Sequence, residues 1–175
     1  MSEEVPEAMV RMGELFVSRT PGQVLASIGL GSCIGLVLVE ASRPLAGLAH
    51  IMLPSSNGDL EAPAGKFADR AVPALVAEMA AIGAAASRLE AILVGGARMF
   101  SFGASDSLDI GRRNEEATRA ELDRLGISVR AAATGGAKGR TVRVHVDSRL
   151  ITVKEPGTAE VELFAPTALG TGRSR

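Results

Sequence analysis

The sequence has no tryptophan and no tyrosine, and aromatic residues make up only 3% of its 175 residues. Any hydrophobic core must therefore be aliphatic, built from Ala, Val, Leu, Ile and Met. Proteins that bind single-stranded nucleic acid commonly stack the bases on aromatic side chains. Because too few aromatic residues are present for such a surface, the composition argues against this class of protein.

Net charge and long apolar runs are also lacking. The formal net charge is −1 at pH 7, which gives no overall attraction to nucleic acid or to anionic lipid. No apolar stretch reaches the roughly 18 residues that a membrane span requires, and the chain begins with acidic residues where a signal peptide would be basic. We therefore expect a cytoplasmic protein with no nucleic-acid partner and no direct membrane insertion.

Cysteine is limited to one residue, Cys33, so no disulfide can form within the chain. The two histidines, His50 and His145, are far apart in the sequence. No cluster with the spacing of metal ligands exists. We therefore expect no metal site.

Hydrophobic periodicity predicts a series of strands interrupted by two helices. Strands are expected at residues 14–19, 24–28, 34–40, 45–53, 89–94, 127–133, 141–146, 150–154 and 161–164, and amphipathic helices at residues 66–82 and 113–125. This order lacks the regular alternation of a doubly wound fold and predicts the α+β class. The length suits one domain, which we place at residues 12–164, between flexible polar tails at residues 1–11 and 165–175.

The most informative segment is a corner between two expected strands, Gly29-Leu30-Gly31-Ser32-Cys33. Its glycines allow backbone angles closed to other residues and let a substrate approach the backbone. A cysteine at the exit of such a corner is well placed as a nucleophile, and the amides of Gly31 and Ser32 are candidates to hold an oxyanion. The alternative is a small buried hydrophobic residue, the commoner role of a lone cysteine.

A cysteine nucleophile needs a base, usually a histidine. His50 lies in the strand expected at residues 45–53, one short turn after the strand that follows Cys33. Strands joined by a tight turn are usually antiparallel neighbours. Because Cys33 lies further from the turn than His50, we expect a bend or stagger to bring them together. A satisfied core position is the alternative for His50, and His145 follows the pattern of a strand surface residue.

Several short blocks, in order along residues 13–154, resemble the chemoreceptor glutamine deamidases of the CheD family. The blocks are Gly29-Leu30-Gly31-Ser32-Cys33, His50-Ile51-Met52-Leu53-Pro54, Lys66-Phe67-Ala68-Asp69, Gly95-Gly96-Ala97-Arg98-Met99-Phe100, Ile110-Gly111-Arg112-Arg113-Asn114 and Thr134-Gly135-Gly136. No single block is specific, but their consistent order identifies the sequence as a member of this family.

The resemblance implies a cysteine hydrolase, similar in its core to the deamidating bacterial cytotoxic necrotizing factors. The fold it implies is a single-domain layered sandwich of mixed, mainly antiparallel sheet with flanking helices. Cys33 is implied as the nucleophile, His50 as the base and Ser27 as the residue that orients the histidine by hydrogen bond. The family usually has threonine at that third position, and serine keeps the hydroxyl group. The implied chemistry needs no cofactor.

The implied activity is hydrolysis of glutamine side-chain amides on the cytoplasmic helices of methyl-accepting chemoreceptors. The products are glutamate and ammonia, formed through a cysteine thioester, and the reaction would tune adaptation in chemotaxis. The implied protein partner is CheC, a phosphatase of the response regulator CheY. A receptor helix needs an open groove, and we expect its walls in the loops at residues 55–65 and 101–107.

Two other functions fit the sequence. One is a non-catalytic regulator that binds a CheC-like partner, and the other is a cysteine hydrolase of small amides. The reactivity of Cys33 tests the first, since a non-catalytic thiol has no reason to be activated. A comparison of receptor fragments with free glutamine tests the second.

Overall fold

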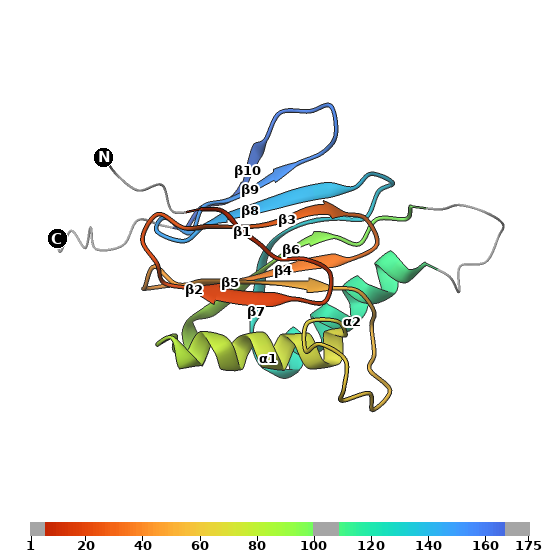
Figure 1. The fold of residues 1–175 in the computed structure, drawn as a ribbon, viewed down its shortest axis with the longest axis horizontal. Helices are drawn as coiled ribbons and strands as arrows, with labels where there is room; N and C mark the ends of the chain where they lie inside the picture. The colour runs from red at the N-terminus through yellow and green to blue at the C-terminus, as the bar shows by residue number, and fades with distance from the viewer. Residues whose placement is uncertain (1–5, 100–108, 167–175) are drawn as a thin grey trace.

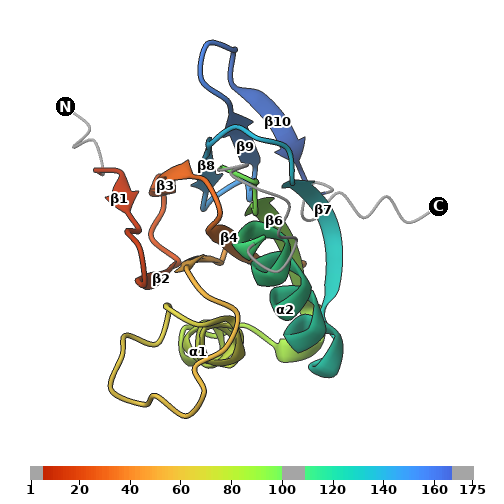
Figure 2. The same cartoon turned by 90° about the vertical axis from the view of Figure 1, so that its right-hand side faces the viewer.

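The computed structural model describes residues 6–99 and 109–166. These residues form three layers, namely two five-stranded sheets packed face to face and two helices that cover the outer face of one sheet (Figure 1). The same stacking is visible from the side (Figure 2). The predicted α+β sandwich is therefore confirmed.

The sheet without helices, sheet A, contains the strands from both ends of the described chain. Its strand order is β1 (Ala8–Met9), β3 (Val24–Leu30), β8 (Arg140–His145), β9 (Ile151–Lys154) and β10 (Val161–Phe164). All neighbours are antiparallel except β1 and β3, which are parallel. Sheet A is thus mixed but mainly antiparallel.

The helix-covered sheet, sheet B, has the strand order β2 (Leu15–Ser18), β5 (Ala46–Ile51), β4 (Ile34–Glu40), β6 (Leu89–Gly95) and β7 (Ser128–Thr134). Its neighbours are antiparallel except β6 and β7. Those two strands are parallel because α2 (Ile110–Arg124) carries the chain between them. A short 3₁₀ helix, η1 (Ala86–Arg88), leads into β6.

Strand β4 is buried along its whole length because it lies between two apolar cores. Alternate residues, such as Leu36 and Leu38, face the helices, while Val37 and Val39 face sheet A. The helix side is closed by α1 (Ala68–Ala81), whose buried residues recur at helical spacing. No helix within residues 6–99 and 109–166 is long and apolar enough to cross a membrane.

The start of the described chain differs from the sequence expectation. Residues 1–11 were expected to form a flexible tail, but Ala8 and Met9 form β1 and pair with β3. The next residue, Val10, is 2% exposed, and its N–H donates to the carbonyl of Ala26 at 2.7 Å. A two-residue strand is too short to produce a periodic pattern, so sequence reasoning could not detect it.

The end of β4 furthest from Cys33 is held by a buried carboxylate, Glu40. Its side chain accepts hydrogen bonds from the guanidinium of Arg88 and from the N–H and hydroxyl of Ser42. Burial by itself would raise the pKa of Glu40, but the bonds from Arg88 and Ser42 outweigh it and lower this pKa to about 2. The buried Arg149 donates to the backbone carbonyls of Glu40 and Ala41 at 2.8 Å each, which joins the two sheets at this end.

The substitution Glu40→Gln is expected to destabilise the protein near neutral pH and much less in acid. The folded-state pKa of about 2 lies below the roughly 4.3 of an ordinary glutamate, so the ionised carboxylate stabilises the fold above that pH and this contribution is lost as the pH falls toward 2. The thermal midpoints of the two proteins should therefore draw together progressively as the pH falls from about 5 to about 2, the window that linkage sets for these two pKa values.

The matched control is Glu116→Gln, which removes an exposed ion pair with Arg112 on α2. Exposed pairs contribute little to stability, so this variant should track the wild type at every pH. A midpoint difference for Glu40→Gln that stayed constant from neutral to acid pH would contradict the assignment.

Candidate active site

The pairing of β4 with β5 places His50 and Cys33 on the same face of sheet B. His50 is opposite Gly35, and residues directly opposite each other in a ladder share a face. Cys33 precedes Gly35 by two positions, and side chains two apart along an extended chain point the same way. Cys33 itself lies in the bend just before β4, and it packs against the core on this face. The sequence predicted a bend or stagger at this point, and the structure has a bend at residues 31–33.

This shared face points into the space between the two sheets. Cys33 packs against the core that fills this space, which includes Val37 on β4 and Leu48 on β5. His50 is 4% exposed, whereas Cys33 is partly exposed. The thiol is therefore more accessible to solvent than the imidazole.

The ring of His50 is held by a main-chain carbonyl. Its Nδ1 lies 3.1 Å from the carbonyl oxygen of Val10. A carbonyl oxygen can only accept a hydrogen bond, so Nδ1 carries the proton of the neutral ring and Nε2 keeps its lone pair. A lone pair on Nε2 is what a general base requires.

Ser27 meets the same carbonyl. Its side chain is buried on β3, and its hydroxyl donates to the oxygen of Val10 at 2.7 Å. The sequence suggested a hydrogen bond from Ser27 to the histidine itself, whereas in the structure the two side chains share the Val10 carbonyl. Sequence reasoning missed Val10 because every residue has a carbonyl, and only the pairing of β1 with β3 puts this one in place.

Burial shifts both members of the pair away from the charged state. It lowers the pKa of His50, although the hydrogen bond with Val10 and the nearby carboxylate of Glu14 act in the other direction. It raises the pKa of the Cys33 thiol. These directions favour a neutral thiol and a neutral imidazole at neutral pH.

The corner that carries Cys33 is tied to the segment that follows β6. The N–H of Gly96 donates to the carbonyl of Cys33 at 2.9 Å, and the N–H of Ala97 donates to that of Gly31 at 2.8 Å. Gly95 has a φ of +112°, and a Cβ there would lie 2.2 Å from the carbonyl oxygen of Cys33. A side chain at position 95 is therefore excluded.

The amides of the corner have no acceptor among the residues that the structure describes. Within residues 6–99 and 109–166, the N–H groups of Gly31, Ser32 and Cys33 donate no hydrogen bond. Gly31 and Ser32 are the two residues that the sequence suggested as oxyanion donors, and the structure adds the amide of Cys33 itself. Their role in binding an oxyanion remains a prediction.

Asn114 is a second residue whose role sequence reasoning missed, although it ends one of the motif blocks. It lies on α2 and is fully buried. Its Nδ2 donates at 2.9 Å to the carbonyl of Ser32 and at 2.9 Å to the carbonyl of Met52. One amide group thus joins the corner before Cys33 to the chain just after His50.

One hollow is lined by His50 and another by Ser32, the residue before Cys33, although Cys33 itself lines neither. A hollow of about 370 Å³ adjoins the histidine, and its lining consists of Met9, Val10, Arg11, Met12, Ile28 and His50. A second hollow of about 160 Å³ lies on the other side of the corner, with a lining of Ser32, Ala97, Arg98, Met99, Asp109, Ile110 and Gly111. The linings include exposed apolar side chains, since Met12 is 64% exposed, Ile28 is 55% exposed and Met99 is 43% exposed, together with the exposed charged residues Arg11 and Arg98.

Only one of the two loops that the sequence predicted as walls can be compared with these linings. The loop at residues 55–65 lines neither hollow, because Asp69 and Arg70 bond it to the start of α1. The loop at residues 101–107 lies outside the described residues.

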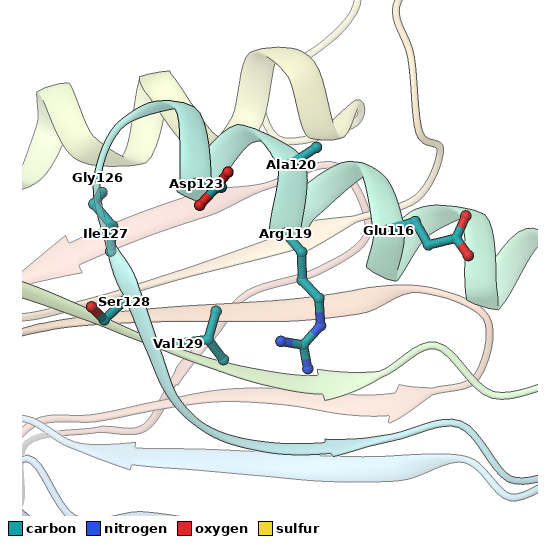
Figure 3. Close-up of a pocket in the computed structure, with 8 residues that line it drawn as sticks. All are labelled: Glu116, Arg119, Ala120, Asp123, Gly126, Ile127, Ser128 and Val129. Carbon is teal, nitrogen blue, oxygen red and sulfur yellow. The ribbon is translucent and has the colours of Figure 1, made fainter.

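A larger hollow, of about 800 Å³, lies between α2 and the edge strand β7 (Figure 3). Its charged lining residues are Glu116, Arg119 and Asp123 on the helix. The beginning of α2, at Gly111, is the part that touches the segment after β6, so this hollow lies toward the end of the helix away from Cys33. It contains neither a cysteine nor a histidine, and we assign it no chemistry.

The other histidine is remote from the thiol. His145 is paired with Val24, at the opposite end of β3 from the corner. Within the described ranges, no three side chains of His, Cys, Asp or Glu lie together as metal ligands would. The geometry therefore singles out Cys33 and His50 as the candidate pair.

Comparison with protein families links the chain to chemotaxis. The model of the CheD chemotactic sensory transduction family matches residues 52–155, which is more than half of the chain. Ser27, Cys33 and His50 precede this matched region. Their assignment therefore depends on the geometry and on the motif blocks.

Individual proteins match over a longer stretch. A probable chemoreceptor glutamine deamidase CheD of Symbiobacterium thermophilum is 43% identical over 166 residues, which cover 93% of this chain and 100% of that protein. The chemoreceptor glutamine deamidase CheD of Thermotoga maritima is 38% identical over 152 residues, covering 87% and 94% of the two chains. The corresponding protein of Halalkalibacterium halodurans is 38% identical over 147 residues, covering 82% and 91%.

Alkylation of Cys33 by iodoacetamide is expected to be slow at neutral pH, so a slow rate does not indicate a non-catalytic thiol, contrary to the test suggested by the sequence. Because burial raises its pKa, the rate should rise with a midpoint above the roughly 8.5 of an ordinary thiol. Cys33 is the only cysteine, so the mass of the intact protein reports its modification. The urea-unfolded chain is the control with an ordinary thiol, and a rate already maximal at neutral pH would show a preformed thiolate and contradict the neutral pair.

Proposed function

Because the chain belongs to the CheD family, we propose that it deamidates glutamine side chains on methyl-accepting chemoreceptors, with Cys33 as nucleophile and His50 as general base. The observation that carries the proposal is the hydrogen bond between Nδ1 of His50 and the Val10 carbonyl, which leaves Nε2 as the basic atom on the face that Cys33 shares. The reaction consumes one water, yields glutamate and ammonia, and needs no cofactor.

In the first half of the reaction, Nε2 of His50 accepts the thiol proton of Cys33 as the sulfur attacks the carboxamide carbon of glutamine. A carbon–sulfur bond forms and the carbonyl electrons move to the oxygen, which the amides of the corner, without an acceptor among the described residues, stabilise. The tetrahedral intermediate then expels ammonia, with the imidazolium donating its proton to the leaving nitrogen. The product of this half is a thioester between Cys33 and the receptor side chain.

In the second half, water replaces ammonia. His50 takes a proton from the water as its oxygen attacks the thioester carbon, and the proton is returned to the sulfur when the carbon–sulfur bond breaks. The released side chain is a glutamate. Ser27 supports both halves in this proposal, because its hydroxyl and the imidazole bond the same Val10 carbonyl and so hold it in place.

The surface around the pair suits a side chain presented by a larger protein. The exposed Met12 and Ile28 beside the histidine provide apolar contacts for residues that flank the glutamine on a receptor helix. Each turnover changes a neutral amide into a carboxylate and so adds negative charge to that helix. This change of charge is the step by which the protein would tune adaptation in the cytoplasm, and the proposal includes CheC as the protein partner that the family resemblance implies.

The proposal predicts turnover on a helical receptor fragment and almost none on free glutamine. Contacts made by the rest of the helix supply the binding energy that positions the carboxamide, and free glutamine lacks them. Conversion of glutamine to glutamate is followed by mass spectrometry of the fragment, together with ammonia release. Cys33→Ala is the control and should release no ammonia. Similar catalytic efficiency on both substrates would favour a small-amide hydrolase, and turnover of neither would favour a non-catalytic regulator.

The two histidines give a matched pair of variants. His50→Ala is expected to lower kcat by about 10²- to 10⁴-fold, the range that a general acid–base contributes, while His145→Gln should leave kcat unchanged. Both proteins are checked by thermal melting, so that loss of activity is not confused with unfolding. The reverse result, with His145 essential and His50 dispensable, would overturn the assignment of the base.

A further inference from the structure

The side-chain amide of Asn114 occupies the place of a missing ladder bond. Strands β4 and β5 stop pairing at Ile34 and Ile51, so Cys33 and Met52 would form the next pair. They do not pair, and the Nδ2 group of Asn114 lies between the two chains instead, bonded at 2.9 Å to the carbonyls of Ser32 and Met52. The last connection between the nucleophile's segment and the base's segment therefore passes through this one side chain.

The neighbours of the amide determine its orientation. Both of its partners are carbonyl oxygens, so exchanging the oxygen and nitrogen of Asn114 would bring Oδ1 against two acceptors. Oδ1 itself is buried and accepts no hydrogen bond from residues 6–99 or 109–166. An unpaired buried acceptor costs free energy, and an apolar side chain at this position would avoid that cost. An asparagine here is thus better explained by its two donated bonds than by packing.

The helix that carries Asn114 is set close to the corner. A Cβ at Gly111, one turn earlier on α2, would lie 2.4 Å from the carbonyl oxygen of Ala97 and 2.7 Å from the carbonyl carbon of Gly96. The glycine therefore allows α2 to contact the segment that bonds the Cys33 corner. This contact makes α2 a fixed support from which Asn114 reaches both chains.

The bond to Ser32 also aims an amide. The carbonyl of Ser32 and the N–H of Cys33 belong to one peptide group, and the described residues contain no cis peptide bond. In a trans peptide these two groups point in opposite directions. Anchoring the Ser32 carbonyl on Asn114 therefore turns the N–H of Cys33 away from α2, where no described acceptor bonds it.

We propose that Asn114 is a positioning residue for catalysis, which holds the Ser32–Cys33 peptide so that the thiol faces His50 and the Cys33 amide faces the reacting carbonyl oxygen. This inference deepens the proposed function and relies on it for the identity of the reaction. Asn114 touches neither the substrate nor the reacting atoms in this role. It acts through the backbone on both sides of the pair.

The test compares Asn114→Ala with Thr118→Val in the full chain. Thr118 is the matched control because it is also fully buried on α2 and also donates one hydrogen bond, at 2.7 Å to the backbone carbonyl of Asn114, yet it bonds neither Ser32 nor Met52. For Asn114→Ala we expect kcat on receptor fragments to fall by about 10- to 100-fold with little change in KM, since misplacing a catalytic group costs up to about 10²-fold. Thr118→Val should lower the thermal midpoint and keep kcat.

A second measurement needs no substrate. If the corner is released in Asn114→Ala, Cys33 becomes less buried, so the pH midpoint of its alkylation should move down toward that of an ordinary thiol. The thiol would then be more reactive toward iodoacetamide but a worse catalyst, whereas the destabilised control Thr118→Val should show neither change at a temperature where both variants are folded. Should Asn114→Ala fail to fold, Asn114→Ser is the alternative, because serine keeps one hydrogen-bond donor. We then expect a smaller fall in kcat and a smaller downward shift of the alkylation midpoint.

The outcomes separate this inference from the proposed function. A folded Asn114→Ala protein with the kcat of the wild type would overturn the positioning role. If the wild type itself does not deamidate receptor fragments, the proposed function fails. The alkylation midpoint of Asn114→Ala then tests on its own whether Asn114 positions the Cys33 corner. In that case a shifted midpoint supports the positioning role, and an unshifted one overturns it.

Discussion

The register between β4 and β5 is the constraint on which the rest of the molecule depends. Opposing His50 to Gly35 sends one set of alternate side chains to the core under the helices and the other set to the core between the sheets. A shift by one residue would exchange the two sets and move His50 to the helix side. The free energy gained by burying the two aliphatic cores therefore favours this register. The same register fixes the position of His50 relative to Cys33.

Around that register, backbone carbonyls rather than carboxylates hold the candidate site together. The carbonyl of Val10 accepts bonds from His50 and Ser27, and the carbonyls of Ser32 and Met52 accept bonds from Asn114. Neutral partners leave the thiol and imidazole uncharged in a dry site, as the directions of their pKa shifts indicate. Such a pair avoids the cost of burying two charges before the substrate arrives.

Strong local patterns allowed much of the fold to be predicted. Strand β4 was expected at residues 34–40 and the structure has it at Ile34–Glu40, because a run of branched aliphatic residues between turn signals suits a doubly buried strand. The helix expected at residues 66–82 is α1 at Ala68–Ala81. The expectation of a tail up to residue 11 did not hold for β1, since a two-residue strand exists only through its partner β3.

The sequence by itself determined the chemical types available, namely one thiol, two histidines and a glycine-rich corner, because composition and motif order do not depend on folding. Which histidine shares a face with Cys33 was decided by the strand register, and only the tertiary structure could supply it. The same is true of the Val10 carbonyl, since every residue carries one and only pairing places it. The bonds of Asn114 also exist only in the fold, because they join segments 82 and 62 residues apart along the chain.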